Sequence, residues 1–264
     1  MKNTISKVLL LALSIITISF IGCSDSSTTP STSYNYAPMK TGSNYVYKNF
    51  RLDSLTGLID SASMRIDSFV VGSPTTMSGK TAYAFDCYTA GTKTRTDYYT
   101  TEGQTVWGYW KFIPPGVGTT ALIDAIFPQD RRWEKFADYA WPLDSNWIIA
   151  DTTINNISLP GVPLPVTVNI KLKGKRVSTS TVTLDGTQYP NTTKFELTLS
   201  PTASLAGINI PLTDVKQYVW IAENVGVIKE EFPAVDLLVT IPGMSPVRFK
   251  GDGTLKVIKS YLVK

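Results

Sequence analysis

The chain has 264 residues, of which 25 are lysine or arginine and 21 are aspartate or glutamate. It has no histidine and two cysteines, Cys23 and Cys87, so the commonest general base and metal ligand is missing and no cysteine cluster can form. Because the charges nearly balance and no dense basic cluster occurs, we expect no nucleic acid partner. The missing histidine and cysteine cluster predict no metal site, and no cofactor is expected.

The first 23 residues have the layout of a secretory signal. Lys2 and Lys7 precede an uncharged apolar run over residues 8–21, and Gly22 and Cys23 follow it. The run is shorter than the roughly 20 residues of a membrane-spanning helix. A small residue and a cysteine directly after such a run resemble the lipobox of bacterial lipoprotein precursors. Ordinary secretory cleavage, which would leave Cys23 as a thiol, is the alternative.

The lipobox resemblance implies that residues 1–22 are a signal peptide and that Cys23 carries acyl chains that anchor the protein in a membrane. The expected location is the bacterial cell envelope. Ser24 after the cysteine favours the outer membrane, with the face of that membrane left open. Residues 23–33 are then the lipidated cysteine and a flexible tether, since 24–33 are almost entirely serine and threonine. Residues 34–264 are expected to form a single β domain.

The first part of this domain carries five strand patterns separated by turn residues. We predict strands over 44–53, 59–71, 80–88, 93–101 and 104–112. Ser54–Gly57, Ala90–Gly91 and Glu102–Gly103 provide turns, and 72–79 is predicted to be a loop. Short connections of this kind favour an antiparallel meander. Cys87 lies on the apolar face of its strand, which is typical of a small core residue and not of a nucleophile.

The segment 113–146 interrupts this rhythm. Trp133, Phe136 and Ala137 have the spacing of an amphipathic helix within 130–137. We therefore predict one or two short helices in the 113–146 insertion, covering an end or a face of the sheet.

The same segment contains the acids Asp130, Glu134 and Asp138, spaced four apart. On a helix they would share one face, which leaves a carboxylate-based hydrolase as the least favoured functional class. The favoured interpretation is a solvated face, because Arg131 and Lys135 are interleaved with the acids.

The second half is predicted to be regular sheet. Residues 166–173 alternate between apolar side chains and polar or lysine side chains, as expected for one buried and one wet face. Asp185–Gly186 is a strong hairpin turn, and Asn224 suits a tight turn between strands at 215–223 and 225–232. The last strand, 253–263, is apolar on both faces toward its end, which predicts a central or covered position.

Two sequence motifs extend the resemblance beyond the lipobox. Residues 36–47 fit Y-x-P-[LM]-x-x-G-x-x-[WY]-x-Y, and 222–229 fit A-x-x-V-G-x-[IV]-K. Both resemble recurrent motifs of uncharacterised bacterial envelope lipoproteins, a family without an activity to carry over. The expected fold is all-β: an antiparallel curled sheet, barrel or half-barrel. Its architecture is similar to the carriers of the lipoprotein-localisation system, which by itself indicates no function.

Three apolar, proline-containing segments stand between strands, at 159–166, 205–212 and 241–247. Proline keeps them out of central strands, so they are expected to be loops or edges that converge at one end of the sheet. The candidate ligand- or partner-binding residues are Val162, Leu164, Ile208, Ile210 and Met244. These side chains either form an apolar rim or fold inward and plug the core.

The composition favours a protein that is not an enzyme. The first hypothesis is a lipid-anchored envelope protein that binds or carries an apolar or amphipathic ligand. The alternative is an envelope scaffold or assembly lipoprotein that docks another protein. A cavity of several hundred cubic ångströms would favour a carrier, and a filled barrel with an exposed apolar patch would favour docking.

Overall fold

The computed structural model describes residue 35 and residues 37–110, 131–157, 165–205, 207–211, 213–239 and 247–264. These residues form strands and turns, and no helix among them is long and apolar enough to cross a membrane. The strands are β1 (Asn44–Leu52), β2 (Ile59–Met77), β3 (Lys80–Thr89), β4 (Thr92–Glu102), β5 (Thr105–Trp110), β6 (Arg132–Asp138), β7 (Asn146–Ile157), β8 (Val166–Leu184), β9 (Thr187–Leu205), β10 (Ile208–Pro211), β11 (Val215–Ala222), β12 (Gly226–Phe232), β13 (Val235–Val239), β14 (Val247–Gly251) and β15 (Gly253–Leu262).

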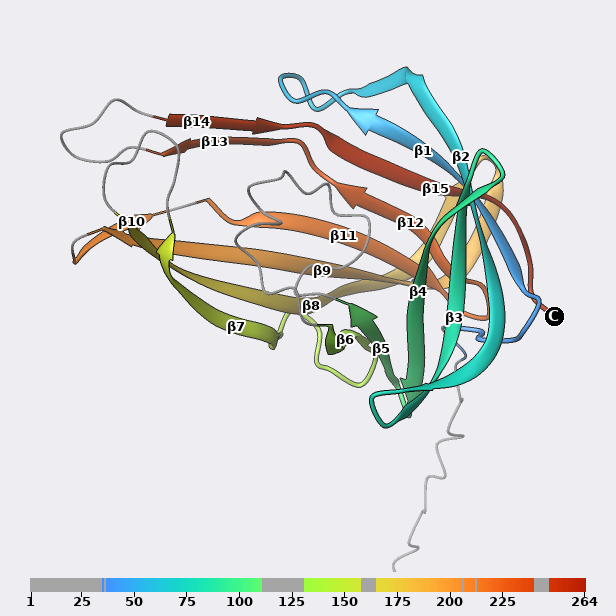
Figure 1. Ribbon diagram of the computed structural model, residues 1–264. Coiled ribbons are helices and arrows are strands. Elements are labelled where there is room, and N and C mark those ends of the chain that lie inside the picture. Colours follow the sequence, from blue (N-terminus) through green and yellow to red (C-terminus); the bar gives the residue numbers. More distant parts are fainter. Residues whose placement is uncertain are drawn as a thin grey trace, which may run out of the picture. The chain divides into compact units, whose positions relative to one another are not determined.

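Twelve of these strands form one antiparallel sheet in the order β6-β5-β4-β3-β2-β1-β15-β12-β11-β9-β8-β7, and β10 adds to β9. The sheet curls until it is nearly closed into a barrel (Figure 1). β13 and β14 form a separate two-stranded hairpin that continues from β12 and leads into β15. The predicted all-β, antiparallel curled sheet is confirmed.

Side chains link the two ends of the strand order, β6 and β7. The indole N–H of Trp147 donates to the backbone oxygen of Lys135 at 3.4 Å, and Arg176 donates to the backbone oxygen of Tyr139 at 2.8 Å. The Trp147 ring lies against Gly174, where an added Cβ would come within 2.2 Å of the indole. A residue larger than glycine at 174 would therefore displace this tryptophan.

The predicted meander of β1 to β5 is confirmed, but the predicted loop over 72–79 is wrong. β2 continues to Met77 and pairs with β3 as far as Lys80. Gly72 and Pro74 interrupt the apolar alternation, which suggested a loop. A register shift between Val71 and Pro74 accommodates them, and the ladder then resumes.

The helix predicted within 130–137 is wrong, because residues 132–138 form β6. Trp133 and Phe136 lie on opposite sides of this strand: Trp133 packs against Tyr109, and Phe136 belongs to the core. The inward-facing residue between them is Glu134, which is 3% exposed. A buried glutamate hides the period-two pattern of a strand, because a charged residue in a sequence is expected to lie at the surface.

The second half follows the prediction more closely. β8 buries one face and leaves the other partly wet, and the turns at Asp185–Gly186 and Asn224 have the expected positive φ angles of 47°, 81° and 59°. β15 lies between β1 and β12, so the last strand is central in the sheet, as predicted.

Candidate functional site

The strands run between two ends of the sheet. The entry end carries Asn35, whose backbone oxygen accepts the N–H of Asn224 at 2.7 Å, and the C-terminal Lys264, whose N–H donates to Ser43. The distal end is where β1 ends and β2 begins, and where β8 begins beside the end of β9. The β13–β14 hairpin also lies away from the C-terminus, on the side of this distal end (Figure 1).

The predicted lipidation site and the candidate binding residues divide into two groups. Cys23, Val162, Leu164 and Met244 lie outside the described residues. Ile208 and Ile210 lie in β10 and pair along the backbone with Leu205 and Ala203 of β9, while the placement of their side chains is outside the description. The strands that flank the three apolar segments all end at the distal end. Because the side chains of the five candidates are not described, the choice between an apolar rim and a plug of the core stays a prediction.

One arc of the barrel interior, here called the aliphatic wall, is built from β8, β9 and β11. Its side chains alternate along each strand and are almost fully buried. They are Val166, Val168, Ile170, Leu172, Phe195, Leu197, Val219 and Ile221.

A second arc carries ionisable side chains and is here called the charged wall: Asp67, Arg95, Asp97, Glu230 and Lys256. Asp97 on β4 interacts electrostatically with Glu230 on β12 and Lys256 on β15. β3, β2 and β1 separate β4 from these strands, so the interaction crosses the interior of the curled sheet.

Aromatic rings surround the ion pairs of the charged wall. Glu230 and Lys256 are directly opposite each other on β12 and β15 and lie 2.6 Å apart. The Lys256 ammonium is 5.2 Å from the centre of the Phe69 ring, and the Arg95 guanidinium is 5.6 Å from the same centre. Burial raises the pKa of Asp97, although Arg95 lies 3.0 Å away. Asp67, Asp97, Glu230 and Lys256 are therefore largely shielded from water among aromatic rings, whereas the Arg95 side chain is 40% exposed.

A cavity of about 80 Å³ lies beside these groups. Its walls include Pro38 and Met39 from the entry end, Ile221 from the aliphatic wall, and the Glu230–Lys256 pair. Six rings also line it: Tyr45, Tyr47, Phe69, Phe85, Tyr99 and Phe136. Sites for drug-sized ligands usually measure about 300 to 1,000 Å³. This cavity has room for a few water molecules or a very small ligand.

Glu134 and Asp138 occupy neither a helix nor a solvated face, and Asp130 lies outside the described residues. Glu134 pairs with Arg132, and burial raises the pKa of Glu134. Asp138 is also buried; it accepts from Lys135 at 2.7 Å and from the backbone N–H of Ala140 at 3.1 Å. The prediction of a solvated face is wrong, because β6 turns Glu134 toward the interior and the chain after Asp138 turns back over it.

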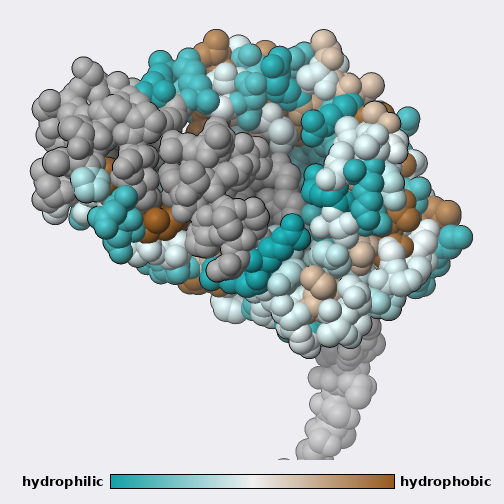
Figure 2. All heavy atoms as spheres, in the orientation of Figure 1, coloured by the Kyte–Doolittle hydropathy of each residue, from teal (hydrophilic) through white to brown (hydrophobic). Residues whose placement is uncertain are grey.

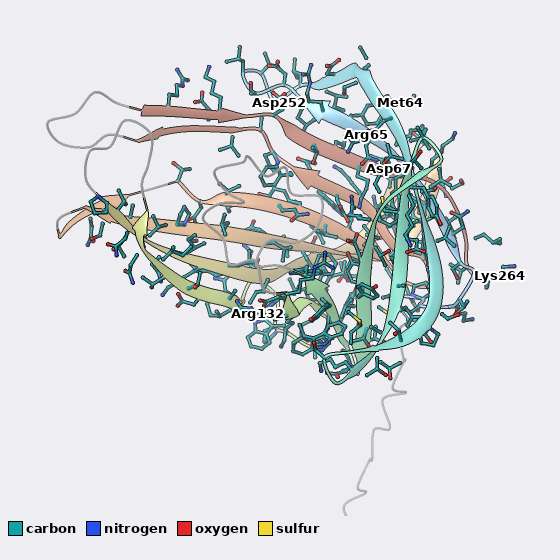
Figure 3. All side chains as sticks on the ribbon, in the orientation of Figure 1. Met64, Arg65, Asp67, Arg132, Asp252 and Lys264 are labelled. Carbon is teal, nitrogen blue, oxygen red and sulfur yellow. The ribbon has the colours of Figure 1, made fainter. Side chains whose placement is uncertain are left out.

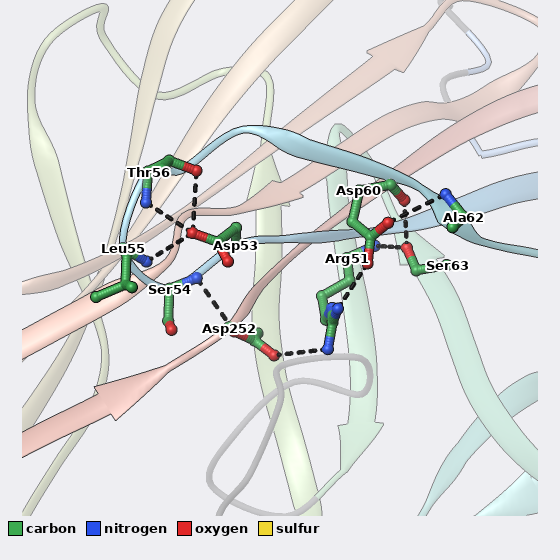
Figure 4. Close-up of polar contacts among 9 residues, drawn as sticks. All are labelled: Arg51, Asp53, Ser54, Leu55, Thr56, Asp60, Ala62, Ser63 and Asp252. Atoms are coloured by element: carbon green, nitrogen blue, oxygen red, sulfur yellow. Dashed lines mark hydrogen bonds and ion pairs between the residues drawn. The ribbon is translucent and has the colours of Figure 1, made fainter.

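At the distal end, hydrogen bonds to one carboxylate shape the turn between β1 and β2 (Figure 4). Asp53 Oδ1 accepts the backbone N–H groups of Leu55 at 3.0 Å and Thr56 at 2.8 Å, and the Thr56 hydroxyl at 3.0 Å. These bonds, led by that from the Thr56 backbone, lower the pKa of Asp53. The carboxylate thus stays ionised at neutral pH and holds the loop backbone in one conformation.

The same turn is tied to the neighbouring strands. The Ser54 N–H donates to Asp252 at 3.1 Å, at the junction of β14 and β15. Arg51 lies 2.6 Å from Asp60 and 3.5 Å from Asp252, so one guanidinium bridges both carboxylates. The loop is therefore fixed at both sides.

Four large apolar side chains of this hairpin face solvent, and we call them the apolar tip: Leu55, Leu58, Ile59 and Met64. Their exposed fractions are 71%, 69%, 50% and 50%. Met64 and Asp252 both lie in the upper part of Figure 3, away from Lys264. On the face drawn in Figure 2, described apolar residues form small separate areas among hydrophilic ones.

Other chemistry finds little support in the described residues. No group of three or more acidic, cysteine or histidine side chains there could hold a metal ion. Cys87 is fully buried, as predicted for a core residue, and burial raises the pKa of its thiol.

The sequence interpretation missed both the charged wall and the apolar tip. The members of the charged wall come from distant strands, so no local pattern unites them. The tip had a visible signal: Leu55 in the predicted turn Ser54–Gly57 and Leu58 directly after it, where polar residues are the rule.

Comparisons with known proteins give a limited result. No family model and no curated protein matches the chain. Two solved structures are similar: a candidate lipoprotein from Parabacteroides distasonis (12% identity, TM-score 0.45) and a candidate exported protein with a YmcC-like fold from Bacteroides fragilis (10% identity, TM-score 0.44). Each match covers 87% of this chain and 99% of the other. Both TM-scores are below 0.5, so neither structure assigns this chain to a family or a function.

Proposed function

We propose that the chain is a lipid-anchored protein of the bacterial envelope that acts without catalysis, by docking another envelope protein at its distal end. The signal sequence ending in Gly22-Cys23 supports the anchor. The exposed apolar tip carries the docking proposal, because isolated apolar residues are common on surfaces whereas four on one short hairpin are not.

The size of the cavity beside the Glu230–Lys256 pair supports docking more than carriage. About 80 Å³ is well below the volume of a typical carrier site, and the aliphatic wall is packed into the core. The carboxylates Asp97, Glu134 and Glu230 each face a basic partner, which does not favour a hydrolase.

Binding of a small amphipathic molecule is a second candidate. The cavity places the rings of Tyr47 and Tyr99 and the apolar side chain of Ile221 next to the Glu230–Lys256 ion pair. An apolar group and a polar group on one ligand would each find a matching surface there.

Native mass spectrometry of the full-length protein, extracted from the envelope in mild detergent, separates the two candidates. Docking predicts a complex with a second protein and no retained ligand, whereas amphiphile binding predicts a small added mass on the chain alone. The chain alone with no added mass, before and after chemical cross-linking, would contradict both.

The anchor has its own test. Cys23→Ser should release the protein from the membrane fraction, because the acyl chains would have no attachment atom. Retention of this variant in membranes would refute lipidation at Cys23.

A further inference from the structure

The apolar tip is presented on a prearranged support. Asp53 fixes the loop backbone, and Asp252 and Arg51 tie the loop to the strands on either side. A rigid loop loses little conformational entropy when it binds, so its exposed leucines are suited to act as anchors in a partner pocket.

The charge around the tip restricts the kind of partner. Asp53, Asp60 and Asp252 surround it, and Arg51 is the basic residue that contacts two of them, so this group carries a net charge of −2. The Arg51 hydrogen bond lowers the pKa of Asp60, which keeps this carboxylate ionised. An acidic rim opposes contact with anionic lipid headgroups and complements lysine or arginine.

The position of the tip also matters. β1 begins at the entry end, where Asn35 lies, and runs nine residues to Leu52 at the distal end. At about 3.3 Å per residue the strand separates the two ends by roughly 30 Å. The tip is thus at the opposite end of the sheet from the point where the chain enters it.

We propose that the apolar tip inserts into an apolar pocket with a basic rim on another envelope protein. This inference rests on the proposed docking function and names its contact residues. In such an interface Leu55 and Leu58 fill the pocket, while Asp60 and Asp252 align with basic side chains around it.

Site-specific photo-cross-linking in intact envelopes tests the inference. A photoreactive phenylalanine analogue is placed at Ile59 of the full-length protein and, as a matched control, at Thr183, an exposed position near the entry end. The expected result is one discrete protein adduct from position 59 and none from 183. Leu55→Ser with Leu58→Ser should reduce the adduct about tenfold, as expected for the loss of anchor residues.

The charge requirement has a conservative variant. Asp60→Asn with Asp252→Asn removes two negative charges but keeps an oxygen that can accept from Arg51 and from the Ser54 N–H. The adduct yield should fall and lose part of its sensitivity to salt. An unchanged yield and an unchanged salt response would overturn the basic-rim pocket.

Other outcomes decide between occupants. An adduct of twice the chain mass would show a second copy of this chain, and binding of the Ser24–Lys264 form to anionic phospholipid vesicles through the tip would show a lipid surface; either overturns the inference. Cross-linkers at Asn155 on β7 and Lys250 on β14, both exposed, separate the two levels of the argument. Adducts from these positions but not from 59 reject the tip and keep distal docking, and no adduct from any of them rejects both.

Discussion

The aliphatic wall on β8, β9 and β11 and the charged wall on β2, β4, β12 and β15 line the same curled sheet, but they contribute differently to its stability. Side chains of the aliphatic wall, such as Phe195 and Leu197, are almost fully buried and gain from leaving water. Glu230 and Lys256 instead lose hydration on burial. Their attraction to one another and the contact of Lys256 with nearby rings offset part of that free-energy cost.

This difference shows which part of the interior is expected to serve stability alone. Replacing a buried ion pair with apolar residues is often neutral or stabilising, so the charged wall is weak evidence for stability. Its position on the cavity, beside Tyr47 and Tyr99, makes it the part of the interior where a ligand would be recognised. The following changes test the comparison.

The largest expected effect is in the aliphatic wall. Phe195→Ala should lower the free energy of unfolding by about 3–5 kcal/mol, because it removes a ring that packs on Tyr139 and Trp147 and leaves a cavity. Urea unfolding followed by tryptophan fluorescence measures it. The control is Thr202→Ala, at an exposed position of the same strand, with an expected change within about 0.5 kcal/mol. Equal losses in the two variants would contradict the assignment.

A smaller effect is expected in the charged wall. Lys256→Met should cost about 2–3 kcal/mol, since Glu230 would lose the partner 2.6 Å away. The double variant Glu230→Gln/Lys256→Met should recover more than half of this loss. On the surface, Lys48→Met breaks the more exposed pair with Asp185 and should cost less than about 1 kcal/mol. A double variant as unstable as the single one would show that packing, and not charge, holds this wall.

Acid should separate the interior carboxylates from those on the surface. Burial raises the folded-state pKa of Asp97 and Glu134, so protonation favours the folded state as pH falls toward the ordinary values near 4. Asp53 and Asp60 have lowered pKa values, and their stabilisation is lost below about pH 4. The chain has no histidine, so stability should rise as the pH falls from neutral toward about 4 and then decrease below about pH 4.

Urea unfolding at each pH checks this profile. Asp97→Asn with Glu134→Gln should flatten the rise and leave the fall below about pH 4 in place. A rise of the same size in this double variant would mean that other groups cause it.

The two walls also differ in how well the sequence predicts them. The alternation at 166–173 correctly predicted β8 and its buried face. The turn residues Asp185–Gly186 and Asn224 correctly predicted two hairpins, because these signals are local. Local signals also failed in informative ways: the buried Glu134 disguised β6 as a helix, and Pro74 disguised the end of β2 as a loop.

The charged wall could not be inferred from such signals. Asp97 meets Glu230 and Lys256 because the sheet curls, and no spacing in the chain encodes that approach. Likewise, Leu55 lies in the correctly predicted turn and Leu58 directly follows it, but their exposure depends on the hydrogen bonds that hold the loop in place.

The smallest expected effect is at the apolar tip, and its smallness is informative. Leu55→Ser with Leu58→Ser should change the free energy of unfolding by no more than about 0.5 kcal/mol, because both side chains are mostly in water already. The matched change is Leu197→Ser in the aliphatic wall, which should cost several kcal/mol through a cavity and a buried hydroxyl. Urea unfolding of both variants measures the difference. A large loss of unfolding free energy at the tip would mean that these leucines support the fold. An unchanged free energy of unfolding would instead agree with a role of the two exposed leucines in binding.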